Sequence, residues 1–217
     1  MMENNILINK RFFDFLAPYY DKGILGKFLS NIIYRTVVSV KIKNNSKILD
    51  VGCGTGNLLY VLERKKSLKL YGIDLSKKMI QIARQKVKTA DIREISVTNL
   101  DKEFVKNYFN YIFIVDAFHH FPNHKRVMKI FYRILKYGGR IIITDFNFGI
   151  ILNKIFSALE PGNTGNYTKE QIKKLFKESG FMVEKQKKIG LFSLMTIGLK
   201  IKGKQIITRH AIKKDIK

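Results

Sequence analysis

Residues 48–59 read Ile-Leu-Asp-Val-Gly-Cys-Gly-Thr-Gly-Asn-Leu-Leu, and this stretch decides the fold. An apolar run reaches an acid at Asp50, three glycines then alternate with small residues, and an apolar helical pattern begins at Leu58. This order predicts a strand, a tight glycine loop and the start of a helix. It is the layout of a site for a nucleotide-type cofactor.

The glycine spacing separates this loop from that of dinucleotide-binding proteins. Their loops follow G-x-G-x-x-G, whereas the third glycine here, Gly56, follows Gly52 and Gly54 one residue earlier. Asp50, where the predicted strand ends, would repel a pyrophosphate and attract a ligand with positive charge. S-adenosylmethionine, which carries a sulfonium and an ammonium group, is such a ligand. A nicotinamide-dependent oxidoreductase is correspondingly disfavoured.

The length and composition indicate one domain, and the cytoplasm is the expected location. The 217 residues are 46% hydrophobic, enough for a sizeable core, but no apolar run is long enough to span a bilayer. The first residues do not have the pattern of a signal peptide. Cys53 is the single cysteine, so no internal disulfide can form, and its place in the glycine loop calls for a small side chain.

The net charge of +24 is extreme and has two interpretations. It would suit nucleic acid or an anionic membrane as a partner. Alternatively, lysines scattered on solvated helix faces reflect a compositional bias, because lysine, isoleucine and asparagine are abundant throughout. The segment Lys185–Lys217 holds ten lysines and arginines and one acid, Asp215. It lacks the interleaved aromatic residues of a surface that binds single strands, so nucleic acid is the less favoured partner.

Alternating strands and helices predict a doubly wound, Rossmann-like sheet of seven strands, mostly parallel, with an antiparallel last strand. We expect a helical N-terminal cap over residues 1–45, a core over 46–203 and a basic tail over 204–217, within a single domain 1–217. A helix over Phe148–Leu159 and the following polar loop suggest a lid over 147–167. The strands are expected at 47–52, 69–74, 93–97, 111–116, 140–145, 181–187 and 191–201, and helices near 56–65, 77–88, 124–136 and 168–179.

A second acid ends the second predicted strand. Asp74 follows Asp50 by 24 residues, a separation at which an acid can accept hydrogen bonds from both ribose hydroxyls. A capping or turn role for Asp74 is the alternative. Ser76 is a good N-cap for the next helix. Leu75 and Met79 could flank an adenine, although plain core packing explains Met79 equally well.

These stretches resemble a known family. Ile48–Leu59 and Tyr71–Ile80 look like the first two motifs of class I S-adenosylmethionine-dependent methyltransferases. Phe109–Phe121 and Ile134–Asp145 resemble the fourth strand and the helix-turn-strand of the small-molecule branch. The opening Phe12–Asp21 is similar to the N-terminal helix of quinone-ring methyltransferases of menaquinone and ubiquinone biosynthesis. The likeness covers about residues 12–188.

The resemblance implies a site for S-adenosylmethionine. Tyr20 and Arg35 would close over the carboxylate of the cofactor, although a solvated helix charge explains Arg35 as well. Thr98 or Asn99 would have to replace the acid that contacts the adenine in many relatives, and Asn110 replaces a common aspartate. The other implied positions are Asp50, Gly52, Cys53, Gly54 and Gly56 in and before the loop, Asp74 at the ribose, and Asp116 and Ala117 beside the reacting methyl.

Two histidines follow the fourth predicted strand, close to the expected methyl group. A base is needed only if the acceptor must lose a proton, and a neutral imidazole of His119 or His120 could accept it near pH 7. The alternative is that one histidine caps a helix and the other packs under the loop. No carboxylate joins the pair at ligand spacing in the sequence, so we expect no metal site.

The preferred function is methyl transfer from S-adenosylmethionine to a small, apolar or aromatic metabolite such as a quinone precursor. Asp116–Pro122 replaces the Asn-Pro-Pro-Tyr motif typical of enzymes that methylate amino groups of nucleic-acid bases. An RNA methyltransferase, favoured by charge alone, and a non-catalytic S-adenosylmethionine-binding protein stay open as alternatives. The expected partners are the small-molecule acceptor and, through the basic surface, an anionic membrane.

Overall fold

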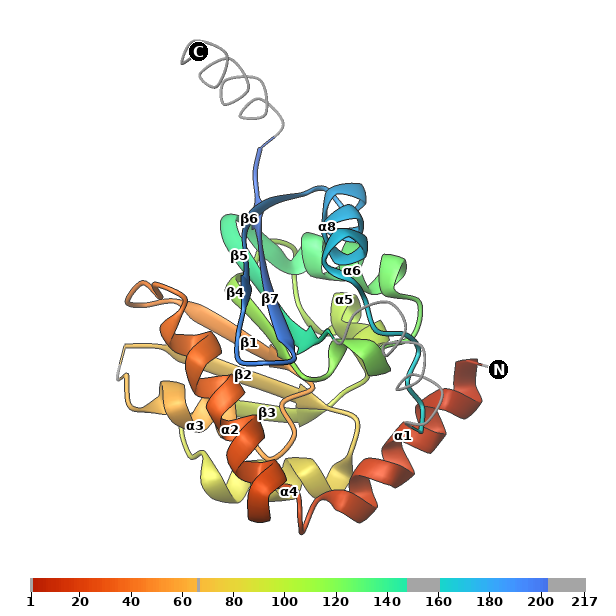
Figure 1. Cartoon of the computed structure of the whole chain (residues 1–217). Coiled ribbons are helices and arrows are strands. Elements are labelled where there is room, and N and C mark those ends of the chain that lie inside the picture. The colour runs from red at the N-terminus through yellow and green to blue at the C-terminus, as the bar shows by residue number, and fades with distance from the viewer. Residues whose placement is uncertain (1, 66, 148–160, 203–217) are drawn as a thin grey trace.

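The computed structural model describes residues 2–65, 67–147 and 161–202, which are arranged around one sheet (Figure 1). Seven strands lie in the order β3-β2-β1-β4-β5-β7-β6. Strands β1 to β5 are parallel, whereas β7 is antiparallel to both β5 and β6. This architecture confirms the predicted doubly wound class. The strands are β1 (Lys47–Val51), β2 (Lys69–Asp74), β3 (Asp91–Glu94), β4 (Phe109–Val115), β5 (Leu135–Phe146), β6 (Phe181–Lys188) and β7 (Ser193–Lys200).

Helices cover both faces of the sheet (Figure 1). Successive strand residues supply the two cores, because Ile48 of β1 packs with α2, α3 and α4 while its neighbour Leu49 packs with α5, α6 and α8. This explains the unbroken apolar runs in the sequence, since the central strands are buried on both faces. The helices are α1 (Met2–Leu16), α2 (Gly23–Val38), α3 (Asn57–Glu63), α4 (Lys77–Lys86), α5 (Leu100–Glu103), α6 (His124–Ile134) and α8 (Lys169–Glu178), with 3₁₀ turns η1 (Val97–Asn99) and η2 (Phe118–His120).

Two predicted boundaries need correction. The third strand was expected at 93–97, but β3 ends at Glu94, because the side chain of Ser96 accepts a hydrogen bond from the Thr98 amide and begins η1. The fifth strand begins at Leu135, five residues before the predicted 140, directly after α6. The predicted lid helix Phe148–Leu159 lies outside the described residues.

The predicted N-terminal cap consists of two helices. Helix α1 lies at the edge of the sheet where the parallel strands end, and a turn over residues 17–22 leads to α2 (Figure 1). The side chains of Leu29, Ile32 and Val37 are buried on the inner side of α2. Within the described residues, none of the helices combines the length and the apolar character needed to cross a membrane.

A buried lysine holds the last strand, β7, in place. It lies at the edge of the sheet opposite to the one where the parallel strands end. Lys200 is 1% exposed, and its ammonium donates hydrogen bonds to Asn107 Oδ1 (2.8 Å), Tyr132 O (2.6 Å) and Leu135 O (2.7 Å). We expect Lys200→Met to lower the free energy of unfolding by about 2–4 kcal/mol, because three buried or partly buried acceptors lose their donor. Urea denaturation measures this. Lys187→Met, at an exposed position of β6, is the control, and equal stability of both variants would contradict the prediction.

Candidate cofactor and acceptor site

An open cavity lies at the carboxyl edge of the sheet, next to the ends of β1, β2 and β4, where the strand order reverses. Ligands bind at this position in open α/β sheets. Nine residues predicted from sequence line the cavity: Tyr20, Gly52, Gly54, Asp74, Leu75, Met79, Asp116, Ala117 and His120.

The glycine loop brings the backbone to the cavity wall. The amides of Gly52 and Cys53 both donate to Ile73 O at 2.9 Å, which holds the loop against β2. Gly52 has a φ of 71°, and a Cβ placed there would lie 2.6 Å from the Cβ of Ala117. Only glycine therefore lets the loop pass this close to the end of β4.

Asp74 faces the cavity from the end of β2 with its carboxylate held in place. Its Oδ2 accepts a hydrogen bond from the Gly54 amide (2.9 Å), and its Oδ1 accepts one from the Ser76 amide (2.8 Å). Burial raises the pKa of this carboxyl, and the backbone amides of Ser76 and Gly54 oppose that effect. The second lone pairs of both oxygens can accept hydrogen bonds from a ligand with two hydroxyls, as a ribose has.

Asp50 lies beneath the loop and is 3% exposed. Burial, together with the neighbouring charge of Asp74, raises its pKa to about 8. Two carboxyls close together in a dry setting favour either a proton or a cationic ligand. The two carboxyls, as hydrogen-bond acceptors and negative groups, therefore fit a ligand with ribose hydroxyls and positive charge, which are the features of S-adenosylmethionine.

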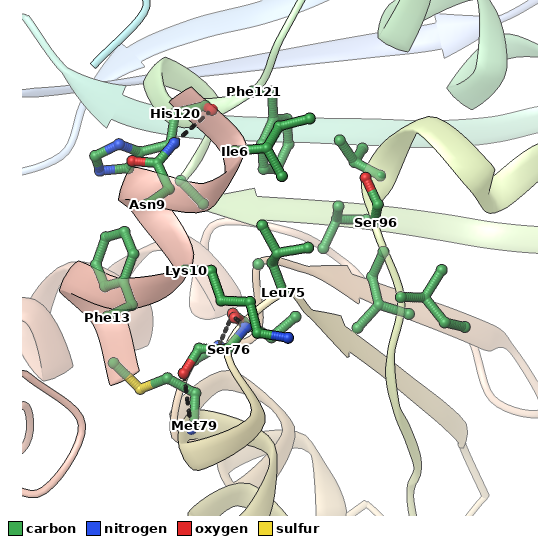
Figure 2. A pocket seen from close by; sticks show the side chains of 18 of the residues that line it. Ile6, Asn9, Lys10, Phe13, Leu75, Ser76, Met79, Ser96, His120 and Phe121 are labelled. Atoms are coloured by element: carbon green, nitrogen blue, oxygen red, sulfur yellow. Dashed lines mark hydrogen bonds between the residues drawn. The ribbon is translucent and has the colours of Figure 1, made fainter. Parts of the chain in front are cut away.

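Helix α1 forms the roof of the cavity (Figure 2). The aromatic N-terminus was expected to shape an apolar pocket, but the residues of α1 that line it were not predicted. Figure 2 shows Ile6, Asn9, Lys10 and Phe13 on the side of α1 that faces the cavity. Their spacing of three, four and seven residues is that of one helix face, and this signal could have identified them. Other missed lining residues are Val51, Ile73, Ser76, Ile95, Ser96, Val97, Phe121 and Pro122.

Polar contacts hold α1 in place over the cavity. Asn9 Nδ2 donates to His120 O and to Gly162 O, both at 3.2 Å, and the second contact joins α1 to the described end of the predicted lid. Lys10 forms an ion pair with Glu94 (2.5 Å). Farther along α1, Asp14 Oδ1 accepts a hydrogen bond from Ser76 Oγ at 2.6 Å. These bonds tie α1 to β3, to the start of α4 and to η2.

The two histidines have different surroundings. His120 lines the cavity, and its ring meets that of Phe13 edge-on at 5.0 Å. His119 is 2% exposed and lies behind His120, with ring centroids 4.1 Å apart. Its Nδ1 lies 2.6 Å from Asp145 Oδ1, and its backbone amide donates to Oδ2 of the same carboxylate (3.0 Å). His120 can thus contact a methyl acceptor in the cavity, whereas His119 supports the position of His120 from behind.

No metal site was expected, because no carboxylate lies at ligand spacing from the two histidines in the sequence, but the fold brings carboxylates to His119. Asp145 follows His119 by 26 residues but reaches it from the end of β5, and the ligand atoms of Asp116, His119 and Asp145 lie within 4.8 Å of one another. The carboxylates at these histidines are brought there by the fold, which sequence spacing cannot show. The short contact of His119 with Asp145 is an ordinary charge-assisted hydrogen bond, so the cluster needs no ion to explain it.

Several predicted residues lie outside the cavity lining. Arg35 is exposed on the outer side of α2, since the opposite side of that helix packs into the core. Thr98 and Asn99 belong to η1, and the preceding Ser96 lines the cavity in their place. Asp50, Cys53, Gly56 and His119 lie behind the lining.

The profile of a known family, described as a methyltransferase domain, matches residues 42–209. The chain belongs to this methyltransferase family. A demethylmenaquinone methyltransferase of Listeria welshimeri is 27% identical over 141 residues, which are 61% of this chain and 60% of the relative. The chain thus spans about 60% of the length of that curated relative. Family membership confirms the interpretation of the two motifs and supports S-adenosylmethionine as the cofactor.

Solved structures agree on the fold. One neighbour is a chain of the complex between the Haloferax volcanii Trm112 methyltransferase activator and a methyltransferase, with a TM-score of 0.78 and 16% identity over 88% of this chain and 98% of that one. Another is a SAM-dependent methyltransferase from Aquifex aeolicus, with a TM-score of 0.66 and 18% identity over 78% of this chain and 89% of that one.

Proposed function

We propose that this protein transfers the methyl group of S-adenosylmethionine to a small, apolar or aromatic metabolite such as a quinone precursor. The observation that carries the proposal is one cavity whose lining has a polar part and an apolar part. Asp74 and the glycine loop form the polar part of the lining. Ile6, Phe13, Phe121 and His120 form the apolar and aromatic part (Figure 2). A cofactor and an acceptor could thus meet within one cavity.

The polar part of the cavity lining would hold the cofactor. Asp74 would accept hydrogen bonds from the ribose hydroxyls, Leu75 and Met79 would flank the adenine, and Asp50 would attract the cationic methionine part. S-adenosylmethionine supplies a methyl group on a sulfonium, which leaves as a neutral thioether when the C–S bond breaks. Alignment and exclusion of water are then the main tasks of the protein. The roof formed by α1 serves both tasks.

The apolar part of the cavity lining would bind the methyl acceptor beside His120. Phe13 and Phe121 offer aromatic surface to a planar ring. When the acceptor loses a proton as it gains the methyl group, the imidazole of His120 takes that proton. His119 and Asp145 act behind it as positioning residues, since the hydrogen bonds between them fix the η2 turn that carries His120.

The relatives support a quinone-type acceptor. The Listeria welshimeri relative is named a demethylmenaquinone methyltransferase. At 27% identity over 60% of that protein, the name supports a substrate class for this chain and no more. An apolar part of the cavity lining is what such a substrate requires.

We expect His120→Ala to lower kcat by at least about 100-fold when the acceptor loses a proton, since general-base catalysis contributes about 10²–10⁴-fold. The affinity for S-adenosylmethionine, measured by calorimetry, should change less than about threefold. His210 lies outside the described residues, and His210→Ala is the control for loss of a histidine. An unchanged kcat in His120→Ala would contradict the assignment of the base.

The acceptor class can be tested with S-adenosylmethionine labelled in its methyl group and separate lipid, small-metabolite and RNA extracts. Label in the lipid or aromatic small-metabolite fraction is the expected result. Label in RNA would favour the RNA methyltransferase alternative. Binding of the cofactor without transfer to any fraction would favour a non-catalytic binding protein.

A further inference from the structure

The outer face of α2 combines exposed apolar and basic side chains. Ile24 is 89% exposed, Tyr34 59% and Val38 60%, and Lys27 and Arg35 are exposed between them. These five residues form what we call the α2 outer face. At 3.6 residues per turn they fall on one stripe, about 21 Å long. The helix Gly23–Val38 contains no acidic residue, so no negative charge interrupts the stripe.

The turn before α2 extends this face. Phe15 is 74% and Tyr19 61% exposed, and the ammonium of Lys22 lies 5.4 Å from the centre of the Tyr19 ring. The acid of this turn, Asp21, is turned toward the body of the protein, where it forms an ion pair with Lys86 (2.6 Å). The charge next to the α2 outer face is therefore positive.

We propose that the α2 outer face, with the turn before it, docks on the surface of an anionic lipid bilayer. Apolar side chains of an interfacial helix enter the boundary between headgroups and acyl chains, and basic side chains beside them meet anionic headgroups. The alternation of Ile24, Lys27, Tyr34, Arg35 and Val38 provides both contributions on one stripe.

Charge complementarity favours a bilayer over other occupants. In a twofold dimer through this face, the stripe would meet its own copy, and Lys27 and Arg35 would face like charges with no acid on α2 to offset them. A nucleic acid could stack on Tyr34, Phe15 and Tyr19, but it would leave the exposed aliphatic side chains of Ile24 and Val38 without an apolar partner. A bilayer accommodates both kinds of side chain.

The position of the face gives docking a consequence for the cavity. Helix α1 roofs the cavity with Ile6 and Phe13, and the turn over residues 17–22 joins it to α2. Docking would bring this roof to the bilayer, from which an apolar acceptor could enter without crossing bulk water. This consequence rests on the proposed function, whereas docking itself does not depend on the acceptor.

Cosedimentation with vesicles tests the proposal. We expect the full chain to bind phosphatidylcholine vesicles containing about 30% phosphatidylglycerol, and to bind pure phosphatidylcholine or vesicles in about 0.5 M salt at least about tenfold more weakly. Lys22→Glu/Lys27→Glu should weaken binding at least about tenfold, and Ile24→Ser/Val38→Ser at least about fivefold.

Matched controls distinguish vesicle binding through the α2 outer face from a nonspecific effect of the protein's positive charge. Lys129→Glu/Lys177→Glu removes the same charge from exposed positions on α6 and α8, and Val105→Ser polarises an exposed apolar residue elsewhere. Both should change vesicle binding less than about twofold. A loss in the α6/α8 variant equal to that in Lys22→Glu/Lys27→Glu would overturn the proposal in favour of diffuse electrostatics.

Other outcomes also overturn the proposal. Absence of binding to anionic vesicles does so directly. A change from dimer to monomer caused by Ile24→Ser/Val38→Ser, without vesicle binding, would make the face a dimer interface. RNA binding lost with the same variants would make it an RNA surface. Calorimetry with S-adenosylmethionine keeps the two proposals apart, since Lys22→Glu/Lys27→Glu should bind the cofactor as the native chain does.

Discussion

The affinity for S-adenosylmethionine should rise about tenfold between about pH 6 and about pH 7, and Asp50→Asn should remove this rise. In the free protein, burial and the charge of Asp74 raise the pKa of Asp50 to about 8, so its carboxyl holds a proton at pH 7. A cation bound beside it favours the ionised form. Binding therefore releases a proton, and the affinity increases with pH until Asp50 is ionised in the free protein as well.

The effect of pH on the stability of the free protein has the opposite sign to its effect on cofactor affinity. The folded pKa of Asp50 lies above the ordinary value of 3.8, so the folded state holds its proton more tightly than the unfolded state between those values. The stability of the free protein therefore falls as pH rises from about 4 to about 8. Asp50→Asn, which carries no titrating group there, should show a smaller fall.

Calorimetry in two buffers of different ionisation enthalpy measures the released proton directly. Near pH 7 the native chain should release close to one proton per bound cofactor beyond what Asp50→Asn releases. The α-amino group of the cofactor titrates near pH 8 in both proteins and cancels in the comparison. Equal proton release by the two proteins would contradict a role for Asp50 in cation binding.

The sequence was sufficient for the parts of the site that are local along the chain. Asp50, Gly52 and Gly54 lie within five residues, and Asp74 ends the next strand. Because neighbouring parallel strands end at the same edge, their meeting follows from the βαβ pattern alone. The hydrogen bond from the Gly54 amide to Asp74 Oδ2 is the direct result.

The features of the site that could not be predicted from the sequence depend on contacts between segments that are distant along the chain. Asn9 reaches His120 across 111 residues, and Asp145 reaches His119 across 26. Arg35 shows a different difficulty. Helix α2 carries apolar residues on its exposed side as well as its buried side, so the pattern does not indicate which side faces the core.

Asp74→Ala should weaken binding of S-adenosylmethionine by at least about 100-fold. Each hydrogen bond to a charged group contributes about 1.5–3 kcal/mol, and the ribose would lose two. The variant also removes the acceptor of the Gly54 and Ser76 amides, so the loop loses part of its support. Calorimetry measures the affinity, and thermal denaturation checks that the variant is folded. Asp91→Ala, at an exposed acid of β3, is the control.

Adenosine separates the roles of the two acids, because it has the ribose but neither positive charge. Asp74→Ala should weaken adenosine binding strongly, whereas Asp50→Asn should leave it nearly unchanged. The acids are also coupled, since the charge of Asp74 helps to raise the pKa of Asp50. In Asp74→Ala the affinity for S-adenosylmethionine should therefore stop rising at a lower pH than in the native chain. An unchanged adenosine affinity in Asp74→Ala would rule out the ribose contact, and an unchanged pH profile would show that the two carboxyls titrate independently.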